Sequence, residues 1–341
     1  MGPDAMNRCA VLGAGSWGTT LALHLDRLGV STALWEFDGQ RAARVAASRL
    51  SLPFLPGRRL PDTIAVTADL AAALRDADVV VLAVPSHALR DVGRSIAPRA
   101  PHREALLWVS ATKGFEEGTG KTPREVLSET VGLALERIVV LAGPSFAVEV
   151  AAQRPTAILA AAVDQDCARR VQRLFSCDHF RVYTSADPLG VEIGVSLKNV
   201  IAIAAGLAAG LSLGANALGA LVTRGLAEIA RLGERMGARP ETFLGLAGIG
   251  DLVMTCTSPL SRNYRVGLAL ARGSSLAQIL DELQMVAEGV RTCRSACELG
   301  RHLGVELPIT DQVHAVLFEG KPPREAVLDL MRRPLKAESR E

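Results

Sequence analysis

The chain has 341 residues, a length that suggests two domains or three at roughly 100–200 residues per domain. Apolar residues make up 49% and charged residues 22%, and the net charge is +2. This balance excludes a disordered chain of one charge sign, and the scattered Lys and Arg residues give no footprint for nucleic acid. The longest uncharged apolar run, residues 200–211, is shorter than the ~18 residues that a membrane-spanning helix needs. We therefore expect a globular protein without membrane insertion.

The N-terminus and the cysteines indicate the compartment. The first eight residues lack the basic and apolar regions of a secretory signal, and Met6 is a possible natural start. The six cysteines form no CxxC pair and show no metal-ligand spacing with histidine. We expect reduced thiols, no metal and a cytoplasmic location, with a metal site or a disulfide as the lesser alternative.

The first 190 residues alternate short apolar runs with helical patterns, which is typical of parallel βαβ units. The run 79–84 is apolar throughout, as in a strand that is covered on both faces. Residues 53–61 are typical of a loop. The predicted strands are Cys9–Gly13, Thr32–Glu36, Val79–Val84, Ala105–Ser110, Ile138–Ala142 and Thr156–Ala161.

The pattern changes near residue 188 and is helical from there to about residue 333, with breaks at glycines and prolines. The predicted fold is α/β: an N-terminal Rossmann-type doubly wound sheet in residues 1–188, followed by an all-α domain in residues 189–333. Residues 334–341 form a C-terminal tail. The default place for a site is between the two domains.

A glycine-rich turn follows the first predicted strand. In Gly13-Ala14-Gly15-Ser16-Trp17-Gly18, the first glycine permits the tight turn and the second lets a pyrophosphate approach the backbone. The third lets the following helix pack against the strand, and the helix N-terminus faces the phosphates. A glycine-rich turn of another α/β fold is the alternative. We predict a dinucleotide site that includes Ser16 and Trp17.

The end of the second predicted strand bears on the choice between NAD and NADP. Glu36 lies where a carboxylate would bind the ribose hydroxyls of NAD. Arg41 and Arg44 follow closely and could instead meet the 2′-phosphate of NADP. Phe37 could stack against the adenine. The sequence therefore leans only slightly to NAD.

Further motifs continue along the chain, and together with the turn at 13–18 they carry a family resemblance. The sequence resembles bacterial NAD(P)-dependent sn-glycerol-3-phosphate dehydrogenases from about residue 8 to residue 333. The resemblance implies reversible hydride transfer between NAD(P)H and dihydroxyacetone phosphate, which supplies glycerol 3-phosphate for phospholipid synthesis. Departures from the family pattern are Trp17, Ser145 and Glu36-Phe37. The motifs are Val84–His87, Ala111–Gly114, Ala142–Ala147, Lys198–Ala202, Thr223–Gly225, Gly250–Leu252, Thr255–Thr257 and Ser261–Asn263.

Lys198 is the predicted catalytic residue. It interrupts an apolar helical run, where an unpaired ammonium group is costly. A snorkelling surface lysine is the alternative. The resemblance implies that Lys198 is the general acid/base of the reaction and also contacts the substrate. Asp251, in a glycine-flanked turn, could orient Lys198 or bind a substrate hydroxyl, and we expect it to be a substrate residue. Thr255 could assist the lysine–aspartate network. For Asp251, N-capping of a helix is the alternative.

The other substrate residues follow predicted strands or start predicted helices. Lys113 comes after the fourth predicted strand, at the sheet edge where such folds bind ligands, although an ordinary loop lysine is the alternative. Gly143 and Ser145 follow the fifth predicted strand and offer a backbone amide and a hydroxyl. Ser261-Arg262-Asn263 suits a phosphate dianion, with a solvated helix start as the alternative.

The resemblance also implies cofactor contacts away from the glycine-rich turn: Lys113, Ala147, Arg262, Val286 and Glu288. The nearest alternative function is a related two-domain hydroxyacid dehydrogenase or ketopantoate reductase, whose substrate carries a carboxylate in place of the phosphate. A nucleotide sensor without catalysis is a further alternative. It would not need a lysine on an apolar helix or a phosphate-binding cluster. A homodimer is possible.

Overall fold

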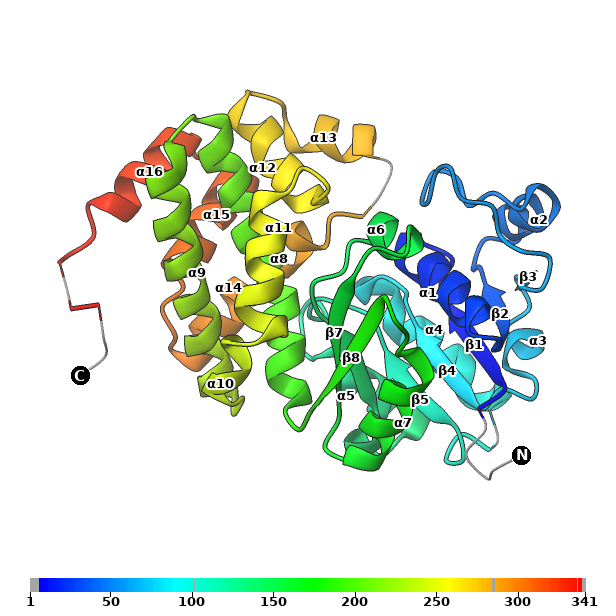
Figure 1. Cartoon of the computed structure of the whole chain (residues 1–341). Helices are drawn as coiled ribbons and strands as arrows, with labels where there is room; N and C mark the ends of the chain where they lie inside the picture. The colour runs from blue at the N-terminus through cyan, green and yellow to red at the C-terminus, as the bar shows by residue number, and fades with distance from the viewer. Residues whose placement is uncertain (1–5, 101, 284–285, 336, 339–341) are drawn as a thin grey trace.

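The computed structural model describes residues 6–100, 102–283, 286–335 and 337–338. An eight-stranded sheet with helices on both faces is followed by a bundle of helices (Figure 1). The strands are β1 (Arg8–Leu12), β2 (Ser31–Trp35), β3 (Ala65–Thr67), β4 (Val79–Leu82), β5 (Leu107–Ser110), β6 (Val139–Ala142), β7 (Thr156–Ala161) and β8 (Phe180–Ser185). The helices around the sheet are α1 (Ser16–Arg27), α2 (Gly39–Ser48), α3 (Leu70–Leu74), α4 (Leu89–Ile96), α5 (Pro123–Leu127), α6 (Ala147–Ala151) and α7 (Gln165–Phe175).

The strand order β3-β2-β1-β4-β5-β6-β7-β8 is that of a doubly wound sheet. The chain leaves β1 towards β2 on one side and later returns to β4 on the other, so the order reverses between β1 and β4. In such sheets, ligands bind beyond the carboxyl ends of the strands at this reversal. The loop after β1 and the loop after β4 are therefore placed side by side at the binding edge.

The two faces of the sheet bury alternate residues of each strand. On β1, Cys9 and Val11 pack in one layer with α1 and α7, while Ala10 and Leu12 pack in the other with α3 and α4. Because both faces are covered, the central strands are apolar throughout and show no alternation of polar and apolar residues. The apolar run at 79–84, which contains the fully buried β4, follows from this coverage.

The fold class is confirmed, but the sheet differs from the prediction in two respects. All six predicted strands exist, with ends within two residues of the expected ones, whereas β3 and β8 were not predicted. β7 runs antiparallel to β6, so the sheet is mixed. β8 alternates buried Phe180 and Val182 with exposed Arg181 and Tyr183, which is the pattern of an edge strand. β3 has only three residues and is too short to produce a pattern.

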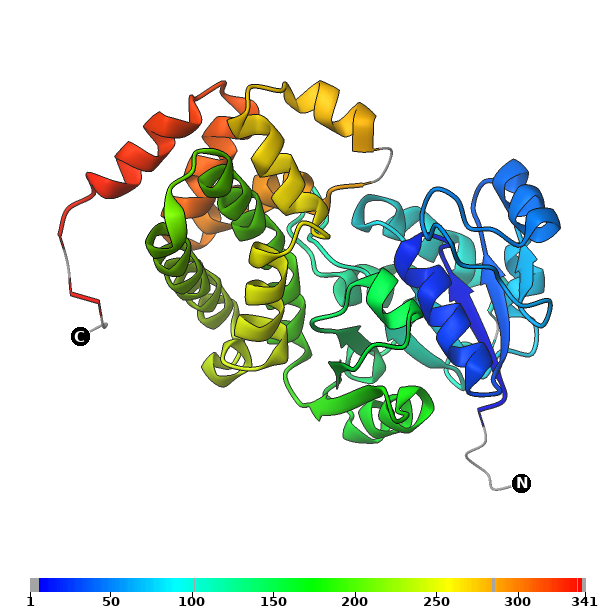
Figure 2. The same cartoon turned by 45° about the horizontal axis from the view of Figure 1, so that its top comes forward.

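In the described residues after β8, helices are the only regular secondary structure, and α8 lies among several of them (Figures 1 and 2). By length and composition α8 could cross a membrane, as could the bent pair Pro240–Thr257 with Arg262–Ala271. However, 78% of the α8 window is buried inside the protein. The helices are α8 (Pro188–Gly210), α9 (Gly214–Met236), α10 (Pro240–Phe243), α11 (Asp251–Thr257), α12 (Arg262–Ala271), α13 (Leu276–Leu283), α14 (Glu288–Leu303), α15 (Pro308–Phe318) and α16 (Pro323–Met331).

Candidate active site

The glycine-rich turn has the space that a dinucleotide needs. Gly13 has φ +110°, and a Cβ there would lie 2.7 Å from the carbonyl oxygen of Ala83. A Cβ at Gly18 would lie 1.9 Å from the carbonyl oxygen of Gly13, so α1 can approach β1 only with glycine there. Gly15 has no neighbour within 4 Å of its Cβ position. The residues present therefore fit a bound pyrophosphate at the N-terminus of α1.

The start of α1 is fixed by contacts with two other segments. Ser16 Oγ donates to the carbonyl oxygen of Phe54 at 2.5 Å, and Thr20 Oγ1 donates to the carbonyl oxygen of Ala147 at 3.2 Å. Ala147 thus stands beside the helix that faces the phosphates. Trp17 is half-buried, and its buried Nε1 has no hydrogen-bond partner among the described residues.

The expected ribose corner is occupied by an ion pair. Glu36 is buried at the end of β2, and its carboxylate lies 3.1 Å from the guanidinium of Arg41. Arg41 also donates to the carbonyl oxygen of Ala14 and lies over the ring of Phe54, 3.9 Å from its centroid. Phe37, in contrast, is 81% exposed. The carboxylate and the competing arginine that the sequence predicted are therefore in contact with each other.

Lys198 forms a buried ion pair between two helices of the bundle. It lies in the middle of α8 with a side chain that is only 5% exposed, and Nζ is 2.5 Å from Oδ1 of the fully buried Asp251. Nζ also donates to Thr255 Oγ1 at 3.0 Å. Asp251 is the first residue of α11 and does not cap it, so the capping alternative is wrong. The snorkelling alternative for Lys198 is wrong as well, because the amine is buried.

Lys113 approaches this pair from the sheet. The backbone amide of Gly114 donates to Ser196 Oγ at 2.9 Å, which joins the loop after β5 to α8 two residues before Lys198. Burial, together with the nearby charges of Lys198 and Arg262, lowers the pKa of Lys113 to about 8, while Asp251 opposes the shift. Lys113 therefore lies close enough to Lys198 for the two charges to interact, which distinguishes it from an ordinary loop lysine.

Glu288 connects the helical bundle to the loop after β4 and lies near the charge of Arg262. Glu288, the first residue of α14, accepts a hydrogen bond from Ser86 Oγ at 2.9 Å. Burial raises the pKa of Glu288, opposed by this bond and by the charge of Arg262. Burial lowers the pKa of Arg262, and Glu288 partly restores it. Val286 lies in the segment just before α14.

The residues on either side of Arg262 have structural partners. Ser261 caps α12, since its Oγ accepts from the backbone amide of Tyr264 at 3.2 Å, and it is buried rather than solvated. Asn263 Nδ2 donates to Asn199 Oδ1 at 2.8 Å, and its Oδ1 accepts from the amide of Gly289 at 3.0 Å. These bonds fix the start of α12 against α8 and α14.

The loop after β6 completes the surroundings. Gly143 has φ +142°, and a Cβ there would lie 3.1 Å from Cα of Ile158. Ser145 Oγ donates to the carbonyl oxygen of Gly143 at 2.9 Å. A Cβ at Gly250 would be 3.9 Å from Pro144, so this loop adjoins the residue that precedes Asp251.

Sequence reasoning missed three positioning side chains: Ser86, Ser196 and Asn199. Each has a polar partner from a distant segment. Ser86 and Asn199 stand inside motifs that the sequence singled out, so a polar side chain on an apolar helix or at a strand end was the available signal. For Ser196, a small hydroxyl in an apolar helix is too common to be informative.

The fold and site define a class. A glycine-rich turn fits a dinucleotide at the strand-order reversal, and a buried lysine–carboxylate pair lies at the junction with a helical domain. These features define a two-domain nicotinamide-dependent dehydrogenase.

Comparison with known proteins identifies the family. Residues 8–168 match the family model described as the N-terminus of NAD-dependent glycerol-3-phosphate dehydrogenase, and residues 187–328 match its C-terminus. A glycerol-3-phosphate dehydrogenase (NAD(P)+) from Geobacter metallireducens is 50% identical over 97% of this chain and 98% of its own length. One from Geobacillus kaustophilus is 48% identical over 98% and 96%. The crystal structure of glycerol-3-phosphate dehydrogenase from Coxiella burnetii has a TM-score of 0.91 at 37% identity and covers 96% of this chain and 99% of its own.

The chain therefore belongs to the NAD-dependent glycerol-3-phosphate dehydrogenase family. It is an oxidoreductase that acts on a CH–OH group and uses NAD or NADP.

Proposed function

We propose that Lys198 is the general acid/base in the reversible conversion of dihydroxyacetone phosphate to sn-glycerol 3-phosphate, the step that supplies the glycerol backbone of phospholipids. The single observation that carries this assignment is the Lys198–Asp251 pair, a buried ion pair between α8 and α11. A buried pair of this kind contributes little to stability compared with apolar residues of similar volume. Its presence beside Lys113 therefore favours a role in chemistry.

The chain's own residues can carry the proton in this reaction. NAD(P)H, when bound, supplies the hydride to C2 of the ketone. The C2 oxygen then gains negative charge, and Lys198 Nζ gives it a proton in reduction and takes one in oxidation. Asp251 and Thr255 hold the amine in place. Lys113 adds positive charge near the developing alkoxide.

The phosphate dianion suits the start of α12. We expect Arg262 to pair with it, and the first-turn amides of α12 to face it. Asn263 uses one amide hydrogen on Asn199, and an amide nitrogen carries two, so the second can face the substrate. Ser261 holds the helix start, and Gly143 with Ser145 borders the same space through Pro144.

For the cofactor, we propose contacts along both sides of the strand-order reversal. The pyrophosphate faces Gly13, Gly15, Ser16, Trp17 and Gly18, and the adenosine end faces the Glu36–Arg41 pair and Phe37. The nicotinamide end faces Lys113, Ala147, Arg262, Val286 and Glu288. Glu288 and Arg262 are supported by their mutual electrostatic interaction and by the bond from Ser86.

A related hydroxyacid dehydrogenase or ketopantoate reductase is the second candidate, since a cationic site also binds a carboxylate. Similarity at 50% identity over 97% of the chain supports the glycerol-phosphate assignment over it. A test is NADH and NADPH oxidation, followed separately by the absorbance of the reduced nicotinamide, with dihydroxyacetone phosphate and with ketopantoate. We expect turnover with the first substrate and none with the second. The reverse result would overturn the proposal.

We further propose that the enzyme is cytoplasmic, does not insert into membranes, binds no nucleic acid and forms a homodimer. The six free thiols fit a reducing compartment, and the net charge of +2 offers little attraction to nucleic acid. Exposed apolar side chains on and just after α16, such as Met331 and Leu335, support self-association. Sedimentation velocity tests the dimer, and a single monomer boundary at micromolar concentration would refute it.

A further inference from the structure

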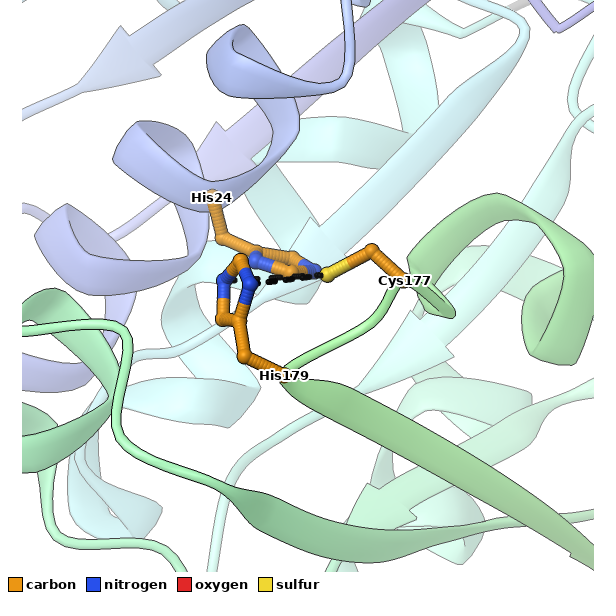
Figure 3. Close-up of side chains that lie close together, drawn as sticks. All are labelled: His24, Cys177 and His179. Carbon is orange, nitrogen blue, oxygen red and sulfur yellow. Dashed lines mark hydrogen bonds between the residues drawn. The ribbon is translucent and has the colours of Figure 1, made fainter.

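Two histidines and a cysteine meet away from the candidate active site. His24 lies near the end of α1, on the opposite end of the helix from the glycine-rich turn, and Cys177 and His179 lie in the turn between α7 and β8. Figure 3 shows the three side chains directed towards one another. One nitrogen of each imidazole and the sulfur of Cys177 lie within 4.8 Å of one another.

The distance between the side chains of Cys177 and His179 is that expected for two ligands of one metal ion. In a tetrahedral zinc site, bond lengths of roughly 2.3 Å to sulfur and 2.0–2.1 Å to nitrogen place these two atoms about 3.5 Å apart. The distances from Cys177 Sγ to Nδ1 and Nε2 of His179 are 3.5 Å and 3.6 Å. Both residues are only half-buried, so a small rotation of the ring can direct one nitrogen to an ion.

His24 is already in the state that a metal ligand requires. Its Nε2 lies 2.7 Å from the carbonyl oxygen of Phe175. A carbonyl only accepts, so Nε2 carries the hydrogen and Nδ1 the lone pair. Nδ1 is buried and has no hydrogen-bond partner among the described residues. Metal-bound histidines usually donate their other N–H to a carbonyl in this way, which fixes the ring.

The surroundings of His24 keep its lone pair free. The ring lies beside two aromatic side chains, with the ring centroid of Phe180 at 4.5 Å and that of Phe175 at 6.2 Å. Burial lowers the pKa of His24, and the nearby His179 and Arg27 act in the same direction, against the hydrogen bond to Phe175. The described residues around the ring therefore offer no donor to the Nδ1 lone pair.

We propose that His24, Cys177 and His179 form a Zn²⁺ site with a solvent molecule as the fourth ligand. Two imidazoles and one thiolate are the ligand types that zinc prefers. The ion would connect α1 to the turn before β8 and satisfy the orphaned Nδ1 atom. The sequence alone predicted no metal because His24 is far from the other two residues along the chain. A simple thiol–imidazole hydrogen bond between Cys177 and His179 is the competing interpretation.

The test uses the full-length protein without an affinity tag, freed of metal by a chelator. Zn²⁺ binding is measured by competition with a chromophoric chelator, and Co²⁺ is added as a spectroscopic probe. We expect one equivalent of metal, a thiolate-to-cobalt charge-transfer band, and a higher midpoint of thermal unfolding with Zn²⁺ than without. In Cys177→Ser and in His179→Ala, the apparent Kd for Zn²⁺ should rise by about a hundredfold or more.

Cys167→Ser is the matched control, since Cys167 lies on the neighbouring α7 but outside the cluster. It should bind zinc as the unmodified protein does. Dehydrogenase activity should be the same in all of these variants, because the cluster takes no part in the reaction. Equal zinc affinity in the unmodified protein and in Cys177→Ser would overturn the proposal, as would a cobalt complex without a thiolate band. Neither result would bear on the assignment of Lys198.

Discussion

Replacement of Lys198 by methionine tests the catalytic assignment most directly, because methionine keeps an apolar stem while it removes the amine. General acid/base groups typically contribute 10²–10⁴-fold to rate, which corresponds to about 2.7–5.4 kcal/mol of barrier at 1.36 kcal/mol per decade. We therefore expect kcat for dihydroxyacetone phosphate reduction to fall by that factor in Lys198→Met. The KM for NADH should change little, because the amine lies away from the glycine-rich turn.

The same variant has a cost in stability that follows from the burial of the pair. Asp251 is fully buried, so loss of Lys198 leaves it without its counter-charge. Breaking a buried ion pair by removing one partner destabilises by about 3–5 kcal/mol, a large part of the roughly 5–15 kcal/mol by which proteins are stable. In Lys198→Met/Asp251→Asn no charge is left alone, and most of that loss should be recovered, while activity stays low.

Both readouts are needed to separate chemistry from folding. Urea unfolding gives the free energy of unfolding of the two variants, and steady-state kinetics at a temperature where each is folded gives kcat. If Lys198→Met kept turnover within tenfold of the unmodified enzyme, Lys198 would not be the acid/base. If the single and the double variants were equally stable, the buried pair would not carry the charge that we assign to it.

Other substitutions test the rest of the site. Gly18→Ala should lower both the affinity for NADH and the midpoint of unfolding, since its Cβ would lie 1.9 Å from a backbone oxygen. Gly15→Ala has open space around its Cβ and should lower only the affinity for NADH. A lysine loses its charge as pH rises through its pKa, so kcat/KM should fall above about pH 8. This fall should disappear in Lys113→Arg, because arginine stays charged at that pH. A fall that persists in the variant refutes Lys113 as its source. Arg262→Ala should lower kcat/KM with dihydroxyacetone phosphate about 10- to 150-fold, as expected for the loss of charge-assisted hydrogen bonds. The loss with unphosphorylated dihydroxyacetone should be much smaller. Equal losses with the two substrates would show that Arg262 does not bind the phosphate. Glu36→Ser frees the guanidinium of Arg41 to meet the 2′-phosphate of NADPH. The ratio of kcat/KM for NADPH to that for NADH, measured at one ionic strength, should therefore rise by about tenfold. An unchanged ratio would show that Glu36 does not influence cofactor choice.

The parts of the fold that were predictable are those in which local pattern and tertiary environment agree. The strand at β4 is apolar because both its faces are covered, and Gly13 and Gly18 are required by contacts within one βα unit. β8 escaped prediction because it lies at the sheet edge. Its alternation of Phe180 and Val182 with exposed residues is a short, weak signal next to an amphipathic helix.

The orientation of β7 could not be read from the sequence. Its residues Thr156–Ala161 predict a strand in either direction, because burial along a strand depends on which faces of the sheet are covered and not on the direction of the neighbouring strand. Direction is decided by the connection. Here the connection, residues 143–155, contains only the five-residue helix α6, and it returns the chain antiparallel to β6.

The site illustrates a second limit, which concerns partners rather than residue types. A buried lysine on an apolar helix implies a counter-charge, and motif spacing pointed to Asp251. Nothing local could show that Glu36 and Arg41, taken from the sequence as competing cofactor determinants, bind each other. A paired carboxylate is a weaker repellent for a 2′-phosphate than a free one, and a paired guanidinium is a weaker attractant. Cofactor choice therefore depends on the free energy of this ion pair, which is why a single substitution at Glu36 should shift the preference only modestly.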